Sequence, residues 1–348
     1  MKKRRLKGLA FTVAAMFALT ACGGESTTTV GEGTAPVGGT GSSVVVRIAY
    51  ENHPGDPIDL AVNEWARLIE EESGGTMTVE LFPSSQLGSK SDVIDQMLAG
   101  DSVITIADGA FYADLGVPDM GITFGPYLFD TWEQAWTLVD SEWWAEQQQE
   151  LQQMGLKILT SNWMFGERHI LSNRPIRTVD DLNGLLIRVP NNVIQAQGFA
   201  VLGASPTPMP LGETYIALQQ GAVDAVENPI PVLVANRFYE VAPYLTLTSH
   251  VKNFTTWVTG TIFFDSLTPQ QQQILIDTGN AAGIYNNQIQ EAEAEAQLEY
   301  LVSQGVEVIE IDMGEFQDRA RPFYELPVFT EIWSDNLYET VRRAMGAN

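Results

Sequence analysis

The sequence predicts an α/β fold, in which helices cover the faces of a β-sheet. Along most of the chain, segments whose apolar and polar residues alternate as in strands are followed by segments whose apolar residues have helical spacing. The roughly 305 residues after position 43 are enough for two domains or one large one. Thr268 and Pro269 begin a helical pattern that runs to about residue 303, and a helix of that length is suited to bracing two lobes.

The first part of the chain has the order β-α-β-α-β. Residues 44–50 are rich in β-branched residues and predict a strand, and residues 58–72 carry apolar side chains at helical spacing. Residues 77–81 alternate apolar and polar side chains, which is typical of a half-buried strand. A helix around residues 93–98 and a strand at 102–107 complete this unit.

The rest of the chain continues the alternation. Residues 131–154 predict one helix, and strands are expected at 156–159, 185–189 and 223–226. After the long helix, residues 306–311 predict a strand, and the C-terminal tail is expected to be helical.

The N-terminal segment predicts export rather than part of the fold. Residues 1–21 begin with basic residues and continue with a short apolar run, which is the pattern of a secretory signal peptide. Cys22 is the only cysteine, and the preceding Leu-Thr-Ala resembles a bacterial lipobox, although a chance cysteine is the alternative. Residues 22–43 are rich in Gly, Ser and Thr and predict a flexible tether. We therefore expect a lipid-anchored protein at the outer face of the cytoplasmic membrane or in the periplasm.

The charge balance excludes nucleic acid as a partner. The chain has 19 basic and 44 acidic residues, and removal of the five basic residues before Cys22 leaves a mature chain of net charge −30. Such a surface repels nucleic acid and anionic lipid. An anionic ligand would have to be bound by a few buried cations.

The motifs of common enzyme classes are missing from the sequence. The three histidines lack the spacing of a zinc helix, and no Gly-x-Ser-x-Gly elbow, Walker loop or dinucleotide-binding fingerprint occurs. A pair of catalytic carboxylates remains possible, but no acidic pair is distinguished from the many others. We expect no enzymatic activity, no metal and no cofactor.

Two arginines and an asparagine stand in apolar surroundings. Arg188 lies in a run suited to a buried strand, where either a protein carboxylate or a ligand carboxylate has to neutralise it. Arg168 raises the same question, with pairing to Glu167 or another acid as the alternative. Asn228 lies at the end of a predicted strand, where α/β folds present ligand groups, but it also fits a turn.

Several motifs resemble the extracytoplasmic solute-binding proteins of tripartite ATP-independent periplasmic (TRAP) transporters. They occur in the family's order and extend from about residue 45 to about residue 325: LFPSSQLG at 81–88, SNRPI at 172–176, DLNGL at 181–185, IRVPN at 187–191, GASPTPM at 203–209 and YIALQQGAVDAVENP at 215–229.

The resemblance implies roles for individual residues. Arg188 is expected to bind the carboxylate of the ligand, Arg168 to make a second contact with the anion, and Asn228 to fix both Arg188 and the carboxylate. Asn191 is expected to line the pocket, and Leu211 stands where members often have an aromatic or bulky residue that faces a ring of the ligand.

Four further ligand-binding candidates come from other segments. Asp108, Glu51 and His53 fall where the family places polar contacts of the first lobe, and Trp163 belongs to the segment that contains Arg168.

The resemblance also implies a periplasmic-binding-protein-like fold: two α/β lobes around a ligand cleft, joined by crossing strands and a long bridging helix. We expect lobe I to comprise residues 44–165 and about 254–290, and lobe II to comprise residues 166–253 and about 291–330. A helical C-terminal tail, 331–348, follows. Hinge closure around the ligand is the expected mechanism.

The expected function is capture of a small carboxylate for a TRAP membrane permease. A sugar acid is our first hypothesis for the ligand, because Asp108, His53 and Glu51 are available to bind hydroxyl groups. A C4-dicarboxylate held by Arg168 and Arg188 is the second, and a 2-oxo acid or sialic-acid-like ligand is a third. The rival functions are a binding protein of an ATP-driven importer or of a sensor system, and an exported enzyme.

Overall fold

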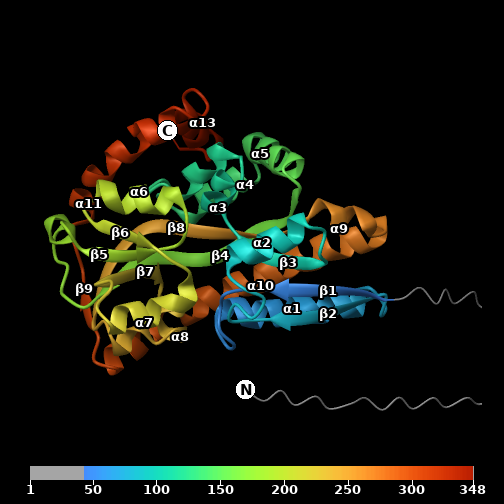
Figure 1. The fold of residues 1–348 in the computed structure, drawn as a ribbon, viewed down its shortest axis with the longest axis horizontal. Coiled ribbons are helices and arrows are strands. Elements are labelled where there is room, and N and C mark those ends of the chain that lie inside the picture. The colour runs from blue at the N-terminus through green and yellow to red at the C-terminus, as the bar shows by residue number, and fades with distance from the viewer. Residues whose placement is uncertain (1–42, 348) are drawn as a thin grey trace, which may run out of the picture. The chain divides into compact units, whose positions relative to one another are not determined.

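Residues 43–347, which the computed structural model describes, are built on one mixed β-sheet (Figure 1). Its strand order is β2-β1-β3-β8-β4-β7-β5-β6, with β9 paired to β8. The strands are β1 (Val44–Ala49), β2 (Met77–Phe82), β3 (Val103–Ala107), β4 (Leu156–Ser172), β5 (Leu186–Val189), β6 (Ser205–Pro208), β7 (Ala225–Pro229), β8 (Tyr244–Gly260) and β9 (Glu307–Ile309).

Helices connect the strands and cover the sheet. The α-helices are α1 (Pro57–Glu72), α2 (Lys90–Leu98), α3 (Gly109–Asp114), α4 (Trp132–Val139), α5 (Glu142–Gln153), α6 (Val193–Val201), α7 (Thr214–Gln219), α8 (Ile230–Ala235), α9 (Thr261–Ser266), α10 (Pro269–Ser303), α11 (Met313–Ala320), α12 (Pro327–Thr330) and α13 (Leu337–Ala344). Short 3-10 helices are η1 (Pro118–Phe124), η2 (Val179–Leu182), η3 (Leu211–Glu213), η4 (Phe238–Glu240) and η5 (Arg321–Glu325). The sequence therefore predicted the α/β class correctly.

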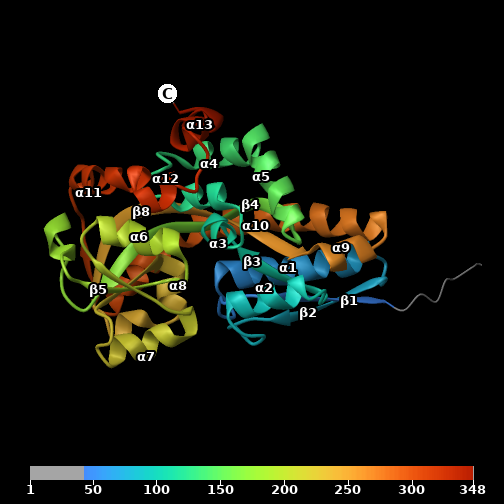
Figure 2. The ribbon, with the colours of Figure 1, turned by 45° about the horizontal axis from the view of Figure 1, so that its top comes forward.

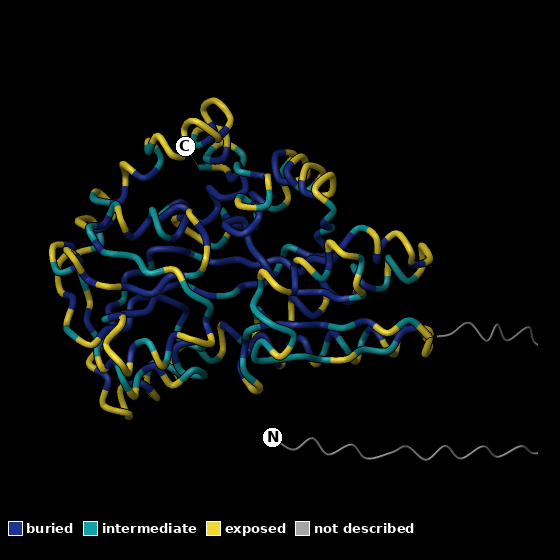
Figure 3. The backbone as a smooth tube through the Cα atoms, in the orientation of Figure 1, coloured by how far each residue is buried: buried dark blue, intermediate teal, exposed yellow. Residues whose placement is uncertain are grey.

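Two long strands, β4 and β8, belong to both lobes. The C-terminal part of β8 pairs with β3 of the first lobe, while the C-terminal part of β4 pairs with β7 of the second. The two strands run side by side in both ribbon views (Figures 1 and 2), and most of their residues are buried (Figure 3). Their register shifts at four places, one of them between Met164 and Gly166. The predicted lobe limits near residues 165 and 253 lie at this crossing, but the limits themselves stay a prediction.

Gly166 shows why the crossing needs a glycine. Its φ of +127° is a conformation that residues with a side chain rarely adopt. A Cβ at this position would also lie 2.8 Å from Cβ of Pro229 on β7. The glycine therefore permits β4 to pass close to the strand that carries Asn228.

The predicted long helix is confirmed as α10. Thr268 caps its start and exchanges hydrogen bonds with Gln271, as a capping box does. Near the middle, Asn286 donates a hydrogen bond to the carbonyl oxygen of Met164 in β4 (2.7 Å). Leu275 packs in the core of the first lobe and Leu301 in the core of the second, so the helix spans both.

One prediction about an individual element was wrong. The single helix expected over residues 131–154 is two helices, because α4 ends at Val139 and the Ser141 hydroxyl caps the start of α5. The strand expected at 156–159 is confirmed, and it continues as the 17-residue β4. Within residues 43–347, no helix is long and apolar enough to cross a membrane. The predicted signal peptide, Cys22 and nearly all of the tether lie outside the described residues.

Candidate functional site

A cavity between the two lobes collects most of the candidate residues. Its walls come from the β1–α1 loop, α2 and the end of β3 on one side, and from β5, β7 and η3 on the other, with β4 and β8 between them. The volume of the cavity is only about 40 Å³, so the side chains nearly fill it. Its lining is Glu51, Asn52, Lys90, Ile106, Asp108, Phe111, Phe165, Arg168, Arg188, Pro190, Gln195, Leu211, Asn228, Asn253 and Thr255.

Arg188 is buried in this wall without a carboxylate partner. It lies on β5, which is flanked by β6 and β7, and only 2% of its surface is exposed. Its Nε and Nη2 both donate to the carbonyl oxygen of Met209, at 3.0 and 2.7 Å. Among residues 43–347, no acid forms an ion pair with it. Burial lowers the pKa of Arg188 to about 10, so it is charged at neutral pH.

The guanidinium of Arg188 has donors that suit an anion. A buried guanidinium is unfavourable unless a counter-charge and acceptors satisfy it. The carbonyl of Met209 supplies an acceptor but no net charge, and it leaves Nη1 without a partner among the described residues. A carboxylate is the group that matches the planar fork of donors.

Arg168 differs from Arg188 because the protein already neutralises it. Its Nε and Nη2 donate to the two carboxylate oxygens of Glu227, at 2.5 and 2.7 Å, and its Nη1 donates to Asn253 (3.0 Å). From the sequence, pairing of Arg168 with Glu167 or another acid was the alternative to a contact with the ligand. Glu227 is that acid, whereas Glu167 pairs with Lys252. Arg168 still lines the cavity, and its predicted contact with the ligand stays a prediction.

Glu227 is the centre of a buried polar cluster. Nε2 of His250 lies 3.2 Å from the same oxygen that accepts from Arg168 Nε. Burial would raise the pKa of Glu227, but Arg168 and His250 outweigh it and hold the pKa at about 2. Arg168 and Glu227 together therefore contribute no net charge, and Arg188 is the unbalanced cation on this side of the cavity.

Asn228 and Leu211 both line the cavity. Asn228 follows Glu227 on β7, is 3% exposed and lines the cavity. Leu211 opens η3 and also lines it, so an aliphatic rather than an aromatic surface is presented there. Their contact with a ligand stays a prediction.

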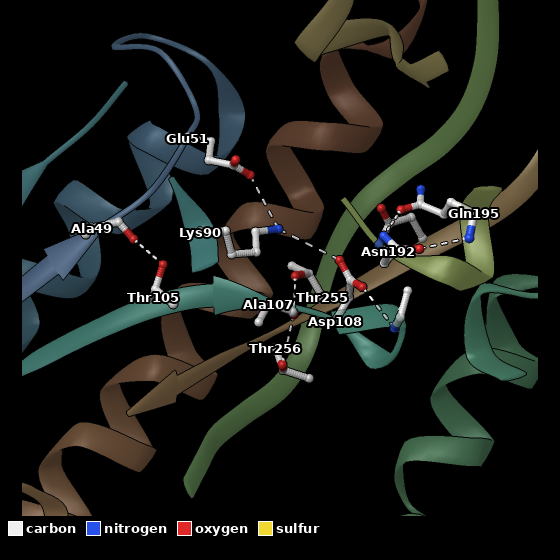
Figure 4. Close-up of polar contacts among 12 residues, drawn as sticks. Ala49, Glu51, Lys90, Thr105, Ala107, Asp108, Asn192, Gln195, Thr255 and Thr256 are labelled. Atoms are coloured by element: carbon white, nitrogen blue, oxygen red, sulfur yellow. Dashed lines mark hydrogen bonds and ion pairs between the residues drawn. The ribbon is translucent and has the colours of Figure 1, made fainter. Parts of the chain in front are cut away.

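The opposite wall contains a lysine between two acids. Nζ of Lys90 lies 3.4 Å from Glu51 Oε2 and 3.9 Å from Asp108 Oδ2, and Figure 4 shows it pointing between them. It also lies 4.4 Å from the centre of the Phe111 ring. Burial raises the pKa of Asp108, and Lys90 counteracts that shift. Glu51 and Asp108 were predicted from the resemblance, but Lys90 was not.

Nothing in the sequence distinguished Lys90 as a site residue. It is the first residue of α2, directly after the capping Ser89, where a lysine usually points into solvent. Only the tertiary structure turns this start of a helix toward the end of β3.

Three candidate residues are not among those that line this cavity, and their predicted contact with a ligand stays a prediction. Asn191 is exposed, because the chain turns away after Pro190. The buried Asn192 instead caps α6 and bonds to Gln195, the residue that does line the cavity (Figure 4). Trp163 is fully buried and packs against Trp65 and Trp257. It is therefore a core residue rather than a wall of the cavity.

His53 is the third. It follows Glu51 and Asn52, which line the cavity, but its ring points to Asn236 and Ser84 instead. No group of three or more metal-ligating side chains is found within residues 43–347.

Comparisons with known proteins identify a matching family model and several similar proteins. The family model of bacterial extracellular solute-binding proteins, family 7 (DctP), matches residues 48–329. The 2,3-diketo-L-gulonate-binding periplasmic protein YiaO of Escherichia coli is 31% identical over 275 residues, which cover 78% of this chain and 83% of YiaO.

Two solved structures extend the comparison. A TRAP periplasmic solute-binding protein of Ochrobacterium anthropi with bound L-fuconate is 40% identical, with a TM-score of 0.83, and the match covers 87% of this chain and all of that one. A TRAP periplasmic solute-binding protein of Actinobacillus succinogenes with bound L-galactonate is 36% identical, with a TM-score of 0.84, covering 87% and 99%.

Proposed function

The chain belongs to family 7 of the bacterial extracellular solute-binding proteins, and we propose that it binds a sugar acid with one carboxylate, held by Arg188 in the cleft between its lobes. It is a solute receptor of a TRAP transport system and not an enzyme. The observation that carries the proposal is the buried guanidinium of Arg188, which has no carboxylate partner within residues 43–347.

The charges on the two walls favour one carboxylate over two. The wall of Arg188 has one positive charge in excess, since Arg168 and Glu227 cancel. The wall of Lys90 has one negative charge in excess while Asp108 is ionised, and no positive excess if Asp108 is protonated. While Asp108 is ionised, a second carboxylate on that wall would meet an excess like charge, and their repulsion is about 4 kcal/mol at 4 Å and an effective dielectric constant of about 20. If Asp108 is protonated, the wall offers that carboxylate no positive excess either. A C4-dicarboxylate is therefore disfavoured.

The same wall suits hydroxyl groups. Lys90 is 3.4 Å or more from its acidic neighbours and makes no hydrogen bond of good geometry to them, so its N–H donors are available. The carboxylates of Glu51 and Asp108 are acceptors. A ligand hydroxyl accepts from Lys90 and donates to either acid. This matches a polyhydroxylated chain, as in the L-fuconate and L-galactonate bound by the similar proteins.

The division of the site between lobes gives the mechanism. Arg188 and Asn228 come from one lobe, and Glu51, Lys90 and Asp108 from the other. A ligand that contacts both stabilises the closed arrangement over the open one, which only differential affinity can do. The nearly filled cavity requires the lobes to separate before a sugar acid enters.

We also propose how the receptor is placed and used. Lipidation of Cys22 and the tether 22–43 would hold it at the outer face of the cytoplasmic membrane, within reach of the TRAP permease that receives the ligand. Labelling of the full chain with a fatty acid tests this point: Cys22→Ser should abolish the label, and label that persists contradicts the anchor.

The ligand class is tested by titrating three compounds that share a six-carbon chain. L-Galactonate has one carboxylate, galactarate has two, and galactitol has none. The wild type should bind L-galactonate at least 100-fold more tightly than galactitol, because the lost carboxylate leaves Arg188 unpaired. Galactarate should bind about tenfold or more weakly than L-galactonate.

Glu51→Gln sharpens the test because it removes one negative charge but keeps an acceptor. It should move the ratio of galactarate to L-galactonate affinity toward galactarate by about tenfold. Galactitol that binds as well as L-galactonate would contradict the role of Arg188. Galactarate that binds as well as L-galactonate in the wild type would contradict the charge argument.

A further inference from the structure

A hydrogen bond joins the two lobes beside the cavity. Nε2 of His53 lies 3.0 Å from Oδ1 of Asn236. His53 is in the β1–α1 loop of the first lobe, and Asn236 ends α8 in the second. Neither residue lines the cavity. The contact is therefore separate from the residues proposed to bind the ligand.

Both partners are held in place by their own lobes. On the histidine side, Ser84 Oγ lies 2.8 Å from Nδ1 of His53, and the backbone N–H of Ser84 donates to the carbonyl of Asn52 (2.9 Å). On the asparagine side, Nδ2 donates to the carbonyl oxygen of Val232 (2.9 Å). That bond fixes which end of the amide is Oδ1 and turns it toward the histidine.

The direction of the bond between the lobes follows from the asparagine. Oδ1 of Asn236 only accepts, so Nε2 of His53 donates to it. Nδ1 of His53 is hydrogen-bonded to the hydroxyl of Ser84, which can either donate or accept. Every group of this short chain is satisfied while the lobes are together, and opening the lobes breaks the His53–Asn236 bond alone.

Each partner is also connected directly to the cavity wall. His53 follows Glu51 and Asn52, and α8 begins directly after Asn228 and Pro229 on β7. Movement of the wall that admits a ligand therefore carries His53 away from Asn236. The pair is positioned to report on closure and to contribute to it.

We propose that His53 and Asn236 form a latch that stabilises the closed receptor and so sets its affinity for every ligand without contacting any. The proposal rests on the hinge mechanism of the proposed function. If the closed state is a minor population before binding, the apparent dissociation constant varies inversely with that population. Loss of one partly exposed hydrogen bond should weaken binding roughly three- to tenfold.

A double-mutant cycle tests the latch. The variants His53→Ala, Asn236→Ala and the double variant are titrated with L-galactonate and L-fuconate. We expect each single variant to bind both ligands more weakly than the wild type, by the same three- to tenfold factor in dissociation constant. The double variant should bind them no more weakly than the single variants. His53→Gln, whose amide N–H replaces Nε2–H, should recover part of the loss.

Asn63→Ala is the matched control. Asn63 Nδ2 donates to the carbonyl of Asp59, four residues earlier on α1, just as Asn236 does to Val232. This control removes the same kind of helix contact without touching the other lobe and should leave affinity unchanged. Additive losses in the double variant, or a changed ratio between the two ligands, would overturn the latch.

A distance measurement separates failure of the latch from failure of the proposed function. Spin labels at Glu72→Cys and Gln219→Cys, in a Cys22→Ser background, place one label on α1 and one on α7, both exposed. His53→Ala should lower the closed fraction in the ligand-free protein. If the wild type binds no sugar acid, the proposed function fails. In that case, equal distance distributions in the wild type and His53→Ala overturn the latch. A lower closed fraction in His53→Ala supports it.

Discussion

Arg168 and Glu227 form a two-pronged ion pair between adjacent strands, with Nε–Oε2 and Nη2–Oε1 distances of 2.5 and 2.7 Å. Both side chains are almost fully buried, at 4% and 0% exposed. The pair is what makes Arg188 the unbalanced cation of the cavity. Removal of either member would leave a buried charge without its counter-charge.

Glu227→Gln should therefore destabilise the protein strongly. Breaking a buried pair by removing one partner costs about 3–5 kcal/mol, and the retained amide recovers part of that. Urea unfolding of the variant and the wild type measures the difference. Glu307→Gln is the control, because Glu307 pairs with Arg177 on the surface, where a pair contributes about 1 kcal/mol or less. Equal effects of the two substitutions would contradict the structural role of Glu227.

His169 should make the stability depend on pH. Burial lowers its pKa to about 4, against an ordinary value of 6.5, and its Nδ1 accepts from the backbone N–H of Ser249. Between these pH values the unfolded chain binds more protons than the folded one. The contribution is thus fully present above pH 6.5 and is lost as the pH falls toward 4.

The variant His169→Gln isolates this effect. The glutamine keeps an acceptor for the N–H of Ser249 but does not titrate. When the pH falls from 6.5 to 4, the unfolding free energy of the variant should therefore decrease by about 3 kcal/mol less than that of the wild type. Asp56, whose pKa burial raises to about 6, acts in the opposite sense but equally in both proteins. Parallel pH profiles would count against the buried neutral histidine.

Gly166→Ala should affect both stability and binding. A side chain there meets Pro229, and φ is +127°, so a cost of about 1–3 kcal/mol is expected. Since Pro229 follows Asn228, the dissociation constant for L-galactonate should rise as well. Gly184→Ala is the control, because its φ is +71° and no atom lies within 4 Å of the added Cβ. Titration of both variants with L-galactonate measures the effect on affinity. A changed affinity in Gly184→Ala, or an unchanged affinity in Gly166→Ala, would contradict this account.

Much of the fold was predictable because local pattern and burial agree. The capping residue and proline at Thr268 and Pro269 predicted the start of α10 correctly. The sequence did not predict β8 as an element, because its polar threonines occupy buried positions, where their hydroxyls bond to backbone carbonyls across the sheet. The break between α4 and α5 depends on one hydroxyl, that of Ser141, within an otherwise continuous helical pattern.

The site was predictable only in part, for a related reason. Arg188 was recognisable as a candidate because a charge in an apolar strand requires compensation. Lys90 gave no such signal, since it lies at an ordinary helix start and gains its meaning from Glu51 and Asp108, which are distant in the sequence. The contact between His53 and Asn236 is likewise a property of the assembled lobes.

The central claim is that Arg188 holds the carboxylate of the ligand, and calorimetric titration of L-galactonate into the wild type and Arg188→Met tests it most directly. Methionine keeps an unbranched side chain for the buried site, and Arg177→Met, at an exposed arginine, is the control. The account predicts a dissociation constant at least 100-fold higher for Arg188→Met, a loss of about 2.7 kcal/mol or more. It predicts no change for Arg177→Met. A dissociation constant for Arg188→Met within threefold of the wild type, in a folded protein, would contradict the claim.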